Sequence, residues 1–204
     1  MRKTGIWAVL AGTMAMVACD GTTEPDDEII LPTEQLTFAR LAAGVTVPTR
    51  DTSFVVTAGE EFILELRTDP EPGDEDGEEF FQFELDQASL LRRPDGTLFQ
   101  PGDTITIHVS IPGNDFIVYF EPSGLRFDPG EPAELQWSYG DADDDLDDDG
   151  DIDDDDLEFE GDLAIWRQEQ PGDPWLRMGG IHEIELDEIE IDITGFTGFA
   201  LAGS

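Results

Sequence analysis

Lysine and cysteine are almost missing from this 204-residue chain, which holds one of each, at Lys3 and Cys19. A single cysteine excludes an intrachain disulfide and any metal cluster held by several thiolates. The two histidines, His108 and His182, are far apart in sequence, and we expect both at the surface. The chain also lacks a nucleophile elbow, a phosphate-binding glycine loop and a zinc motif. We therefore expect a protein that is not an enzyme.

Basic residues are scarce as a class. Ten lysines and arginines face 49 aspartates and glutamates, which gives a formal charge of −39 at neutral pH. Such a charge repels phosphate groups, so nucleic acid and anionic lipid headgroups are poor candidates as partners, and we expect no binding of nucleic acid. It favours divalent cations, basic proteins or a saline environment. An acid-rich surface of this kind also resembles that of proteins from salt-adapted organisms, for which acidity is a solubility trait.

The first residues predict export and lipid anchoring. Arg2 and Lys3 precede an apolar run, residues 6–17, that is too short to span a bilayer, so residues 1–18 predict a signal peptide. The sequence Met-Val-Ala-Cys at its end resembles a bacterial lipobox, in which the cysteine, here Cys19, is lipidated and becomes the new N-terminus. Residues 19–35 are polar, acidic and interrupted by prolines, as expected of a tether. We expect an envelope protein, lipid-anchored on the periplasmic or outer surface, with a protein or glycan of the envelope as its partner.

Residues 36–204 predict one all-β domain, an antiparallel β-sandwich. Apolar residues alternate with polar ones in short runs separated by proline and glycine turns, which is the period of strands with one buried face. Eight to ten strands are expected, and no helix is predicted after the signal peptide. The apolar positions are Phe62, Leu64, Leu66; Phe81, Phe83, Leu85; Ile105, Ile107, Val109, Ile111; Phe116, Val118, Phe120; Leu135, Trp137, Tyr139; Leu157, Phe159, Leu163, Ile165; and Ile184, Leu186, Ile189, Ile191, Ile193. The change from even to odd positions at Asp187 and Glu188 indicates a hairpin or bulge.

A family resemblance lies in the second half of the chain. Residues 120–129, FEPSGLRFDP, with Leu135 nearby, are similar to the proline-glycine corner of ZU-type domains, β-sandwich modules of ankyrins, netrin receptors and bacterial surface lipoproteins. The segments around Trp175 and residues 196–201 resemble later motifs of that family. Some members cleave themselves at a His-Phe-Ser triplet, which this chain replaces with Gly195-Phe196-Thr197. The resemblance implies a non-catalytic interaction module, with residues 141–162 as an insertion between two strands.

That insertion is the most acidic part of the chain, with 12 aspartates between Asp141 and Asp156. Its spacing matches a calcium loop, because alternate carboxylates and a glycine at the turn deliver hard oxygens to one ion. In this register Gly150 occupies the turn position and Ile152 is the apolar residue expected to point inward. The predicted ligands are the side chains of Asp145, Asp147, Asp149, Asp153 and Asp156, with the carbonyl oxygen of Asp151.

The segments on either side of the insertion, around Trp137 and around Phe159, predict strands rather than the helices of an EF-hand. The loop therefore looks more like the free-standing calcium loops of thrombospondin type-three and dockerin repeats. Asp156 is shorter than the usual glutamate at the last position, so we expect a Kd on the order of 10⁻⁴ to 10⁻³ M. In the alternative interpretation the aspartates bind no particular ion and form a solvated or salt-adaptive loop.

A second function class is a carbohydrate-binding module, in which exposed aromatic rings stack on sugars. Trp166 has the opposite phase from Leu163 and Ile165, and Trp175 follows a loop of glycine, aspartate and prolines. Both are candidate stacking residues.

Overall fold

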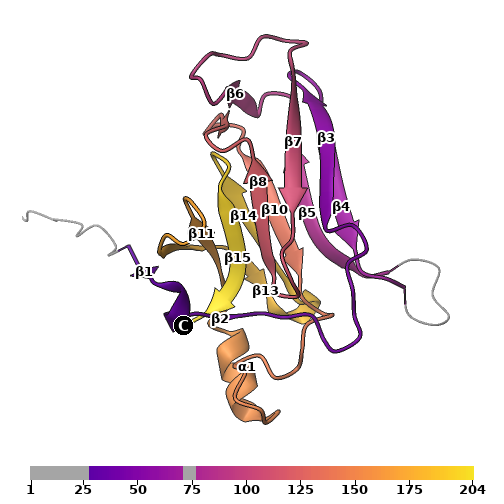
Figure 1. Cartoon of the computed structure of the whole chain (residues 1–204), viewed down its shortest axis with the longest axis vertical. Coiled ribbons are helices and arrows are strands. Elements are labelled where there is room, and N and C mark those ends of the chain that lie inside the picture. The colour runs from indigo at the N-terminus through magenta and orange to yellow at the C-terminus, as the bar shows by residue number, and fades with distance from the viewer. Residues whose placement is uncertain (1–27, 71–76) are drawn as a thin grey trace, which may run out of the picture.

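The computed structural model describes residues 28–70 and 77–204. The predicted signal peptide, the lipidated Cys19 and most of the predicted tether lie outside these residues. Within them the chain forms two packed antiparallel sheets, a two-stranded ribbon and one short α-helix (Figure 1). The prediction of an all-β sandwich is confirmed.

The larger sheet has eight strands. Its order is β1 (Ile30–Leu31), β12 (Trp175–Gly179), β11 (Ala164–Gln168), β15 (Gly198–Gly203), β8 (Ile117–Glu121), β7 (Thr104–Ser110) and β3 (Asp51–Thr57), with β2 (Thr37–Phe38) also paired to β15. The smaller sheet has the order β13 (Ile181–Glu183), β14 (Glu188–Ile193), β10 (Ala133–Ser138), β5 (Glu79–Leu85) and β4 (Phe62–Arg67). The ribbon pairs β6 (Leu90–Arg92) with β9 (Arg126–Phe127).

The main core lies between the two sheets and is rich in phenylalanine. Phe83 of β5 lies 5.4 Å from Phe120 of β8, and Phe120 stacks on Phe196 at 4.5 Å between ring centroids. These rings are at most 3% exposed. Their positions follow from the sequence, because alternate residues of a strand point to the same face of its sheet. The predicted alternation is confirmed on β4, β5, β7, β8, β10 and β14.

A second apolar layer covers the outer face of the larger sheet, where solvent was expected. Trp166 and Trp175 are 0% and 2% exposed and pack with Ala164, Ala200 and Ala202. Their indole nitrogens donate to the carbonyl oxygen of Ala202 at 2.9 Å and to Oγ1 of Thr33 at 3.2 Å. The prediction that either tryptophan is exposed for sugar stacking is therefore wrong.

The cover of this layer comes from residues 31–38, the first of which were assigned to the tether. Leu31, Leu36 and Phe38 pack on the tryptophans, and β1 pairs with β12. A 3-10 turn, η1 (Thr33–Gln35), separates β1 from β2. The folded domain thus includes residues from Ile30 onward, and the predicted boundary at residue 35 is too late. Packing of these apolar residues on the sheet overrides the polar, proline-containing composition of the segment.

The hairpin predicted around Asp187 is confirmed, with one change. Strands β13 and β14 pair through the 3-10 turn η2 (Ile184–Leu186), and Asp187 adopts the left-handed conformation that closes it. Ile184 and Leu186 are therefore exposed turn residues at 49% and 58%, and do not belong to a strand.

The outer face of the smaller sheet carries a row of like charges. Glu134 of β10 lies directly opposite Glu84 of β5 and Asp192 of β14. Burial, together with repulsion from Glu190, Glu84 and Asp192, raises the pKa of Glu134. A raised carboxyl pKa means that the folded state holds the proton more tightly than the unfolded state. Charged Glu134 therefore opposes folding at neutral pH, and this opposition fades as the pH falls through the raised pKa.

We expect Glu134→Gln to stabilise the domain at neutral pH by about 0.5 kcal/mol, because directly opposed like charges destabilise a sheet by this order. The gain should shrink at mildly acidic pH and at high salt. Urea denaturation at both pH values measures it. Glu60→Gln, in the exposed turn between β3 and β4, removes the same charge and is the matched control. Equal gains from both variants would mean that total charge, not the cross-strand row, sets the effect.

Candidate metal centre

The acidic insertion follows β10 as a loop and contains the helix α1 (Asp154–Glu160), and loop and helix lie beyond one end of the sandwich (Figure 1). Its carboxylates bind the loop's own backbone. Asp145 accepts hydrogen bonds from the amides of Asp149 and Gly150, both at 3.1 Å. Asp147 accepts from the amide of Asp149 at 3.1 Å, and Asp149 from that of Asp151 at 2.9 Å. These bonds turn the alternate side chains toward one centre.

The result is a group of three carboxylates. Oxygens of Asp145, Asp147 and Asp149 lie within 4.8 Å of one another. Desolvation raises the pKa of Asp147, and the charges of Asp149, Asp156 and Asp145 raise it further. Three negative groups at this separation repel one another. A divalent cation at their centre would remove that repulsion, and hard carboxylate oxygens are the ligands that calcium prefers.

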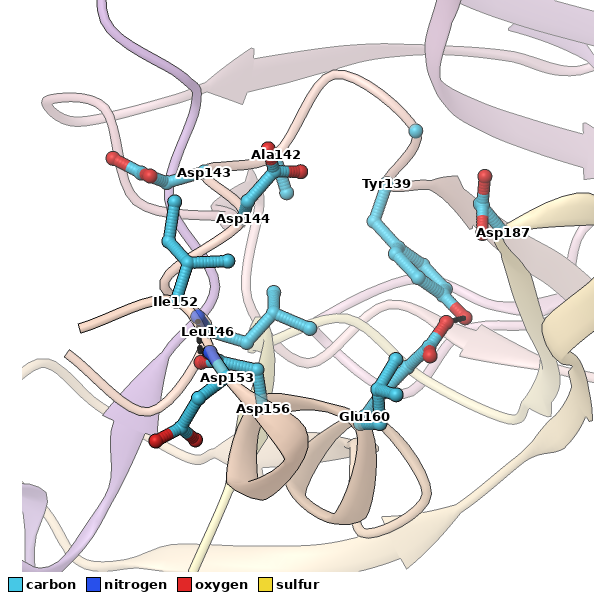
Figure 2. A pocket seen from close by; sticks show the side chains of 12 residues that line it. Tyr139, Ala142, Asp143, Asp144, Leu146, Ile152, Asp153, Asp156, Glu160 and Asp187 are labelled. Atoms are coloured by element: carbon cyan, nitrogen blue, oxygen red, sulfur yellow. Dashed lines mark hydrogen bonds between the residues drawn. The ribbon is translucent and has the colours of Figure 1, made fainter. Parts of the chain in front are cut away.

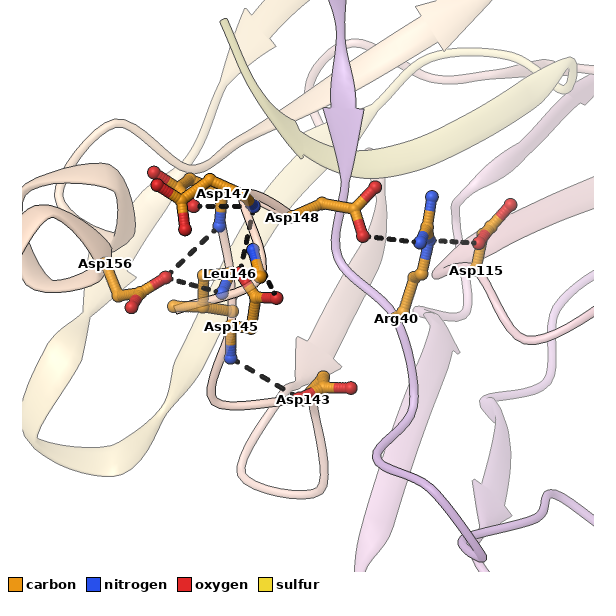
Figure 3. A network of polar contacts seen from close by, with 10 residues as sticks. Arg40, Asp115, Asp143, Asp145, Leu146, Asp147, Asp148 and Asp156 are labelled. Atoms are coloured by element: carbon orange, nitrogen blue, oxygen red, sulfur yellow. Dashed lines mark hydrogen bonds and ion pairs between the residues drawn. The ribbon is translucent and has the colours of Figure 1, made fainter. Parts of the chain in front are cut away.

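Two residues with positive φ shape the turn. Gly150 has φ 96° and Asp148 has φ 61°. Glycine adopts such values without steric cost, and aspartate tolerates them better than most side chains. The Asp148 carboxylate points away from the group and accepts from Nη1 of Arg40 at 2.8 Å, while Nε of Arg40 pairs with Asp115 at 3.3 Å (Figure 3). The ion pairs tie the loop to Arg40, which precedes β3, and through Arg40 to Asp115, between β7 and β8.

Helix α1 was not predicted, and the expectation of a strand around Leu157 and Phe159 is wrong. Asp153 caps the helix by accepting from the amide of Asp155 at 2.8 Å, and Asp156 accepts from the amide of Asp153 at 2.8 Å. This reciprocal capping box, with aspartates in the first turn, favours a helix start. The spacing of Asp153 and Asp156 was a signal for it, although glutamate or glutamine is the usual partner at the third position.

Asp156 fastens the loop to this helix. It is 4% exposed, and its Oδ1 accepts from the amides of Leu146 at 2.8 Å and Asp147 at 3.3 Å (Figure 3). Backbone hydrogen bonds, that from Asp153 first, lower its pKa although desolvation opposes them. Both oxygens are thus engaged with backbone amides. The structure makes Asp156 a support for the loop.

The predicted ligands therefore separate into two sets. Asp145, Asp147 and Asp149 come together, whereas Asp153 and Asp156 cap the helix and hold the start of the loop. Asp151 is exposed, and its amide donates a hydrogen bond to the carboxylate of Asp149. Ile152 was expected to point inward, but it is 68% exposed. The first turn of α1 starts two residues later and leaves Ile152 outside the packed part of the loop.

A hydrogen-bond network that the sequence did not predict joins α1 to Tyr139, directly after β10, and to His182 of β13. The Tyr139 hydroxyl donates to Glu160 of α1 at 3.1 Å (Figure 2). The same hydroxyl lies 2.6 Å from Nε2 of His182 in β13. His182 was expected at the surface but is partly buried, and burial lowers its pKa. Tyr139 and Glu160 border a pocket of about 240 Å³ between the loop, α1 and Asp187. Little in the sequence indicated this network, because Tyr139 alternates with Leu135 and Trp137 as a core residue would.

Comparison with protein-family models, with curated proteins and with solved structures found no match. No helix within residues 28–70 and 77–204 has both the length and the apolar character needed to cross a bilayer. The geometry of the site therefore carries the functional argument.

Replacing Asp156 with asparagine should loosen the loop. The asparagine nitrogen cannot accept a hydrogen bond, so amides of Leu146, Asp147 and Asp153 lose part of their support. We expect about tenfold faster hydrogen exchange at these amides. Because the Asp156 pKa is lowered, wild-type protection should persist below neutral pH and disappear only as the pH falls through that pKa.

Asp155→Asn is the control for this exchange experiment, since it removes a neighbouring exposed carboxylate that supports none of these amides. Unchanged exchange in Asp156→Asn would contradict a supporting role for Asp156.

Proposed function

We propose that this chain is a lipid-anchored envelope protein whose β-sandwich is a non-catalytic interaction module with a calcium-binding loop. The observation that carries the calcium proposal is the approach of Asp145, Asp147 and Asp149 within 4.8 Å, on a backbone already turned by their hydrogen bonds. A preformed loop reduces the ordering that binding must impose.

The donor set favours calcium over other divalent ions. Residues 139–160 hold no histidine and no cysteine, which zinc prefers as ligands. Magnesium demands near-ideal octahedral geometry, whereas calcium accepts six to eight oxygens in flexible arrangements. In the proposed site Asp145, Asp147 and Asp149 are the carboxylate ligands, with the Asp151 carbonyl and water completing the set. Asp153 and Asp156 position the loop, and the small number of direct carboxylate ligands agrees with weak, extracellular-grade affinity.

Export and anchoring rest on the sequence of residues 1–19. The proposed lipid on Cys19 would hold the domain at a membrane surface without a spanning helix. The segment between Cys19 and β1 is short, so the folded domain would lie close to that membrane. The resemblance to ZU-type domains stays a prediction, and it agrees with an interaction role.

The sugar-binding alternative has lost its main support. It depended on Trp166 and Trp175, and both rings are buried under residues 31–38. The other alternative is that the acidic loop is only solvated or salt-adaptive. A calcium titration distinguishes it from a specific calcium site.

Calorimetric titration of residues 20–204 with calcium, in about 0.15 M salt to screen diffuse attraction, tests the site. We expect saturable binding of one ion with a Kd on the order of 10⁻⁴ to 10⁻³ M. Bound calcium should also raise the stability, by about 1.4 kcal/mol when its concentration is tenfold above Kd. The triple variant Asp145→Asn, Asp147→Asn, Asp149→Asn should lose both effects.

The matched control is Asp154→Asn, Asp155→Asn, Glu158→Gln, which removes three exposed charges from α1 and leaves the three-carboxylate group intact. It should bind calcium with nearly wild-type affinity. Weak, unsaturable heat that is equal in all three proteins would refute the calcium proposal and favour the solvated loop.

Expression of the full chain in a bacterium tests the anchor. The wild-type protein should partition into the detergent phase and carry a lipid on Cys19 detectable by mass spectrometry. Cys19→Ser should yield protein in the aqueous phase, because the acyl attachment atom is gone. Wild-type protein recovered without lipid would refute lipid anchoring and leave the calcium proposal unaffected.

A further inference from the structure

A second pocket lies near the opposite end of β15 from the acidic loop. Gly203, at the end of β15, lies against Phe159 of α1, whereas Gly198, at its start, lines this pocket. The pocket has a volume of about 680 Å³, within the usual range for small-ligand sites. Its walls come from the corner after β8, the end of β11 and the segment that leads into β15.

Two of the few arginines of this acidic protein, Arg126 and Arg167, line the pocket. Arg126 forms no hydrogen bond and no ion pair through its side chain in the described part of the chain. Arg167 pairs with Glu169 at 2.6 Å through Nη2, and its Nε is buried, so a ligand in the pocket does not reach that atom. Arg40 and Arg93, by contrast, pair with aspartates. A guanidinium left without a carboxylate in so acidic a chain has donors available for a ligand.

Glycines keep the space beside these groups open. A Cβ at Gly195 would lie 2.9 Å from Nη1 of Arg126, and a Cβ at Gly198 would lie 2.5 Å from the ring of Tyr119. Either contact is too close for a side chain without movement of its neighbour. Gly198 thus leaves room for the Tyr119 ring, and Gly195 leaves room for the Arg126 guanidinium, which a side chain there would displace.

The charge of the pocket indicates the class of ligand. Arg126 and Arg167 are balanced by Glu121 and Glu169, so the lining is formally neutral within a chain of charge −39. The surrounding field would strongly oppose a multiply charged anion such as a phosphate ester, and less strongly a monoanion. A guanidinium matches the planar fork of a carboxylate. Ser123 and Gln170 add polar groups for the rest of the ligand.

We propose that this pocket binds a small polar ligand through a single carboxylate held by the guanidinium of Arg126, with Arg167 adding a second positive charge to the pocket wall. The carboxylate could come from a sugar acid or from a peptide. This site does not depend on the calcium loop, because the two share no residue.

Titration followed by ¹H–¹⁵N NMR in metal-free buffer at about 0.15 M salt tests the proposal, since calcium would otherwise pair with the probes. The probes are D-galacturonate for the sugar source and N-acetylglycine for the peptide source. D-galactose and N-acetylglycinamide are the matched probes without a carboxylate. We expect saturable shifts of the Gly195 and Gly198 amides with one of the two acids, at a Kd on the order of 1 mM for ligands of this size.

Arg126→Gln should weaken that binding about tenfold or more, the usual effect of losing a charge-assisted hydrogen bond. Arg177→Gln, which removes an equal charge from β12 outside the pocket, should bind as the wild type does. Amides of Asp149 and Gly150 in the acidic loop should not shift. The proposal is overturned if neither acid saturates, if the uncharged probes bind equally well, or if both arginine variants behave alike.

Discussion

Repulsion among carboxylates is the constraint on which the rest of this structure depends. With 49 acidic residues against ten basic ones, ion pairing can neutralise only a small fraction of the negative charge. The remaining carboxylates need water or backbone amides, because an unpaired buried charge costs several kcal/mol. The strands meet this requirement by alternation, with phenylalanines between the sheets and acids outside. Where acids of neighbouring strands are directly opposed, as at Glu134, the fold tolerates a local electrostatic cost.

In the acidic insertion, backbone amides take the place that basic side chains have in other proteins. Asp156 is the clearest example, since three amides surround a nearly buried carboxylate. The same arrangement starts α1 and orients Asp145, Asp147 and Asp149. Tyr139 then connects α1 to β10 and, through His182, to β13. An ion held by the proposed site would therefore act on a loop that is mechanically joined to the smaller sheet.

The two candidate sites differ in electrostatic character and lie toward opposite ends of β15. The acidic loop gathers negative charge, whereas the Arg126 pocket is a neutral region in a negative molecule. Such separation would allow a cation and a carboxylate ligand to be held at once without pairing with each other. In both places the nearby side chains, rather than the net charge of the chain, determine which kind of ligand the proposed site would bind.

The sequence by itself determined the all-β class, the buried face of β4, β5, β7, β8, β10 and β14, the hairpin at Asp187 and the grouping of Asp145, Asp147 and Asp149. These features depend on residue spacing of two, which is visible without knowledge of the neighbours. Tertiary structure alone decided the fate of Trp166 and Trp175, because burial of an outward-facing residue depends on which segment folds over it. It also decided the role of Asp156 in the loop, since the amide of Leu146 that it accepts from lies ten residues away. The start of α1 lacks an apolar period, and its signal in the sequence was the spacing of Asp153 and Asp156. The pocket at Arg126 was decided by tertiary structure alone, since its walls join segments from β8, β11 and β15 that no local pattern connects.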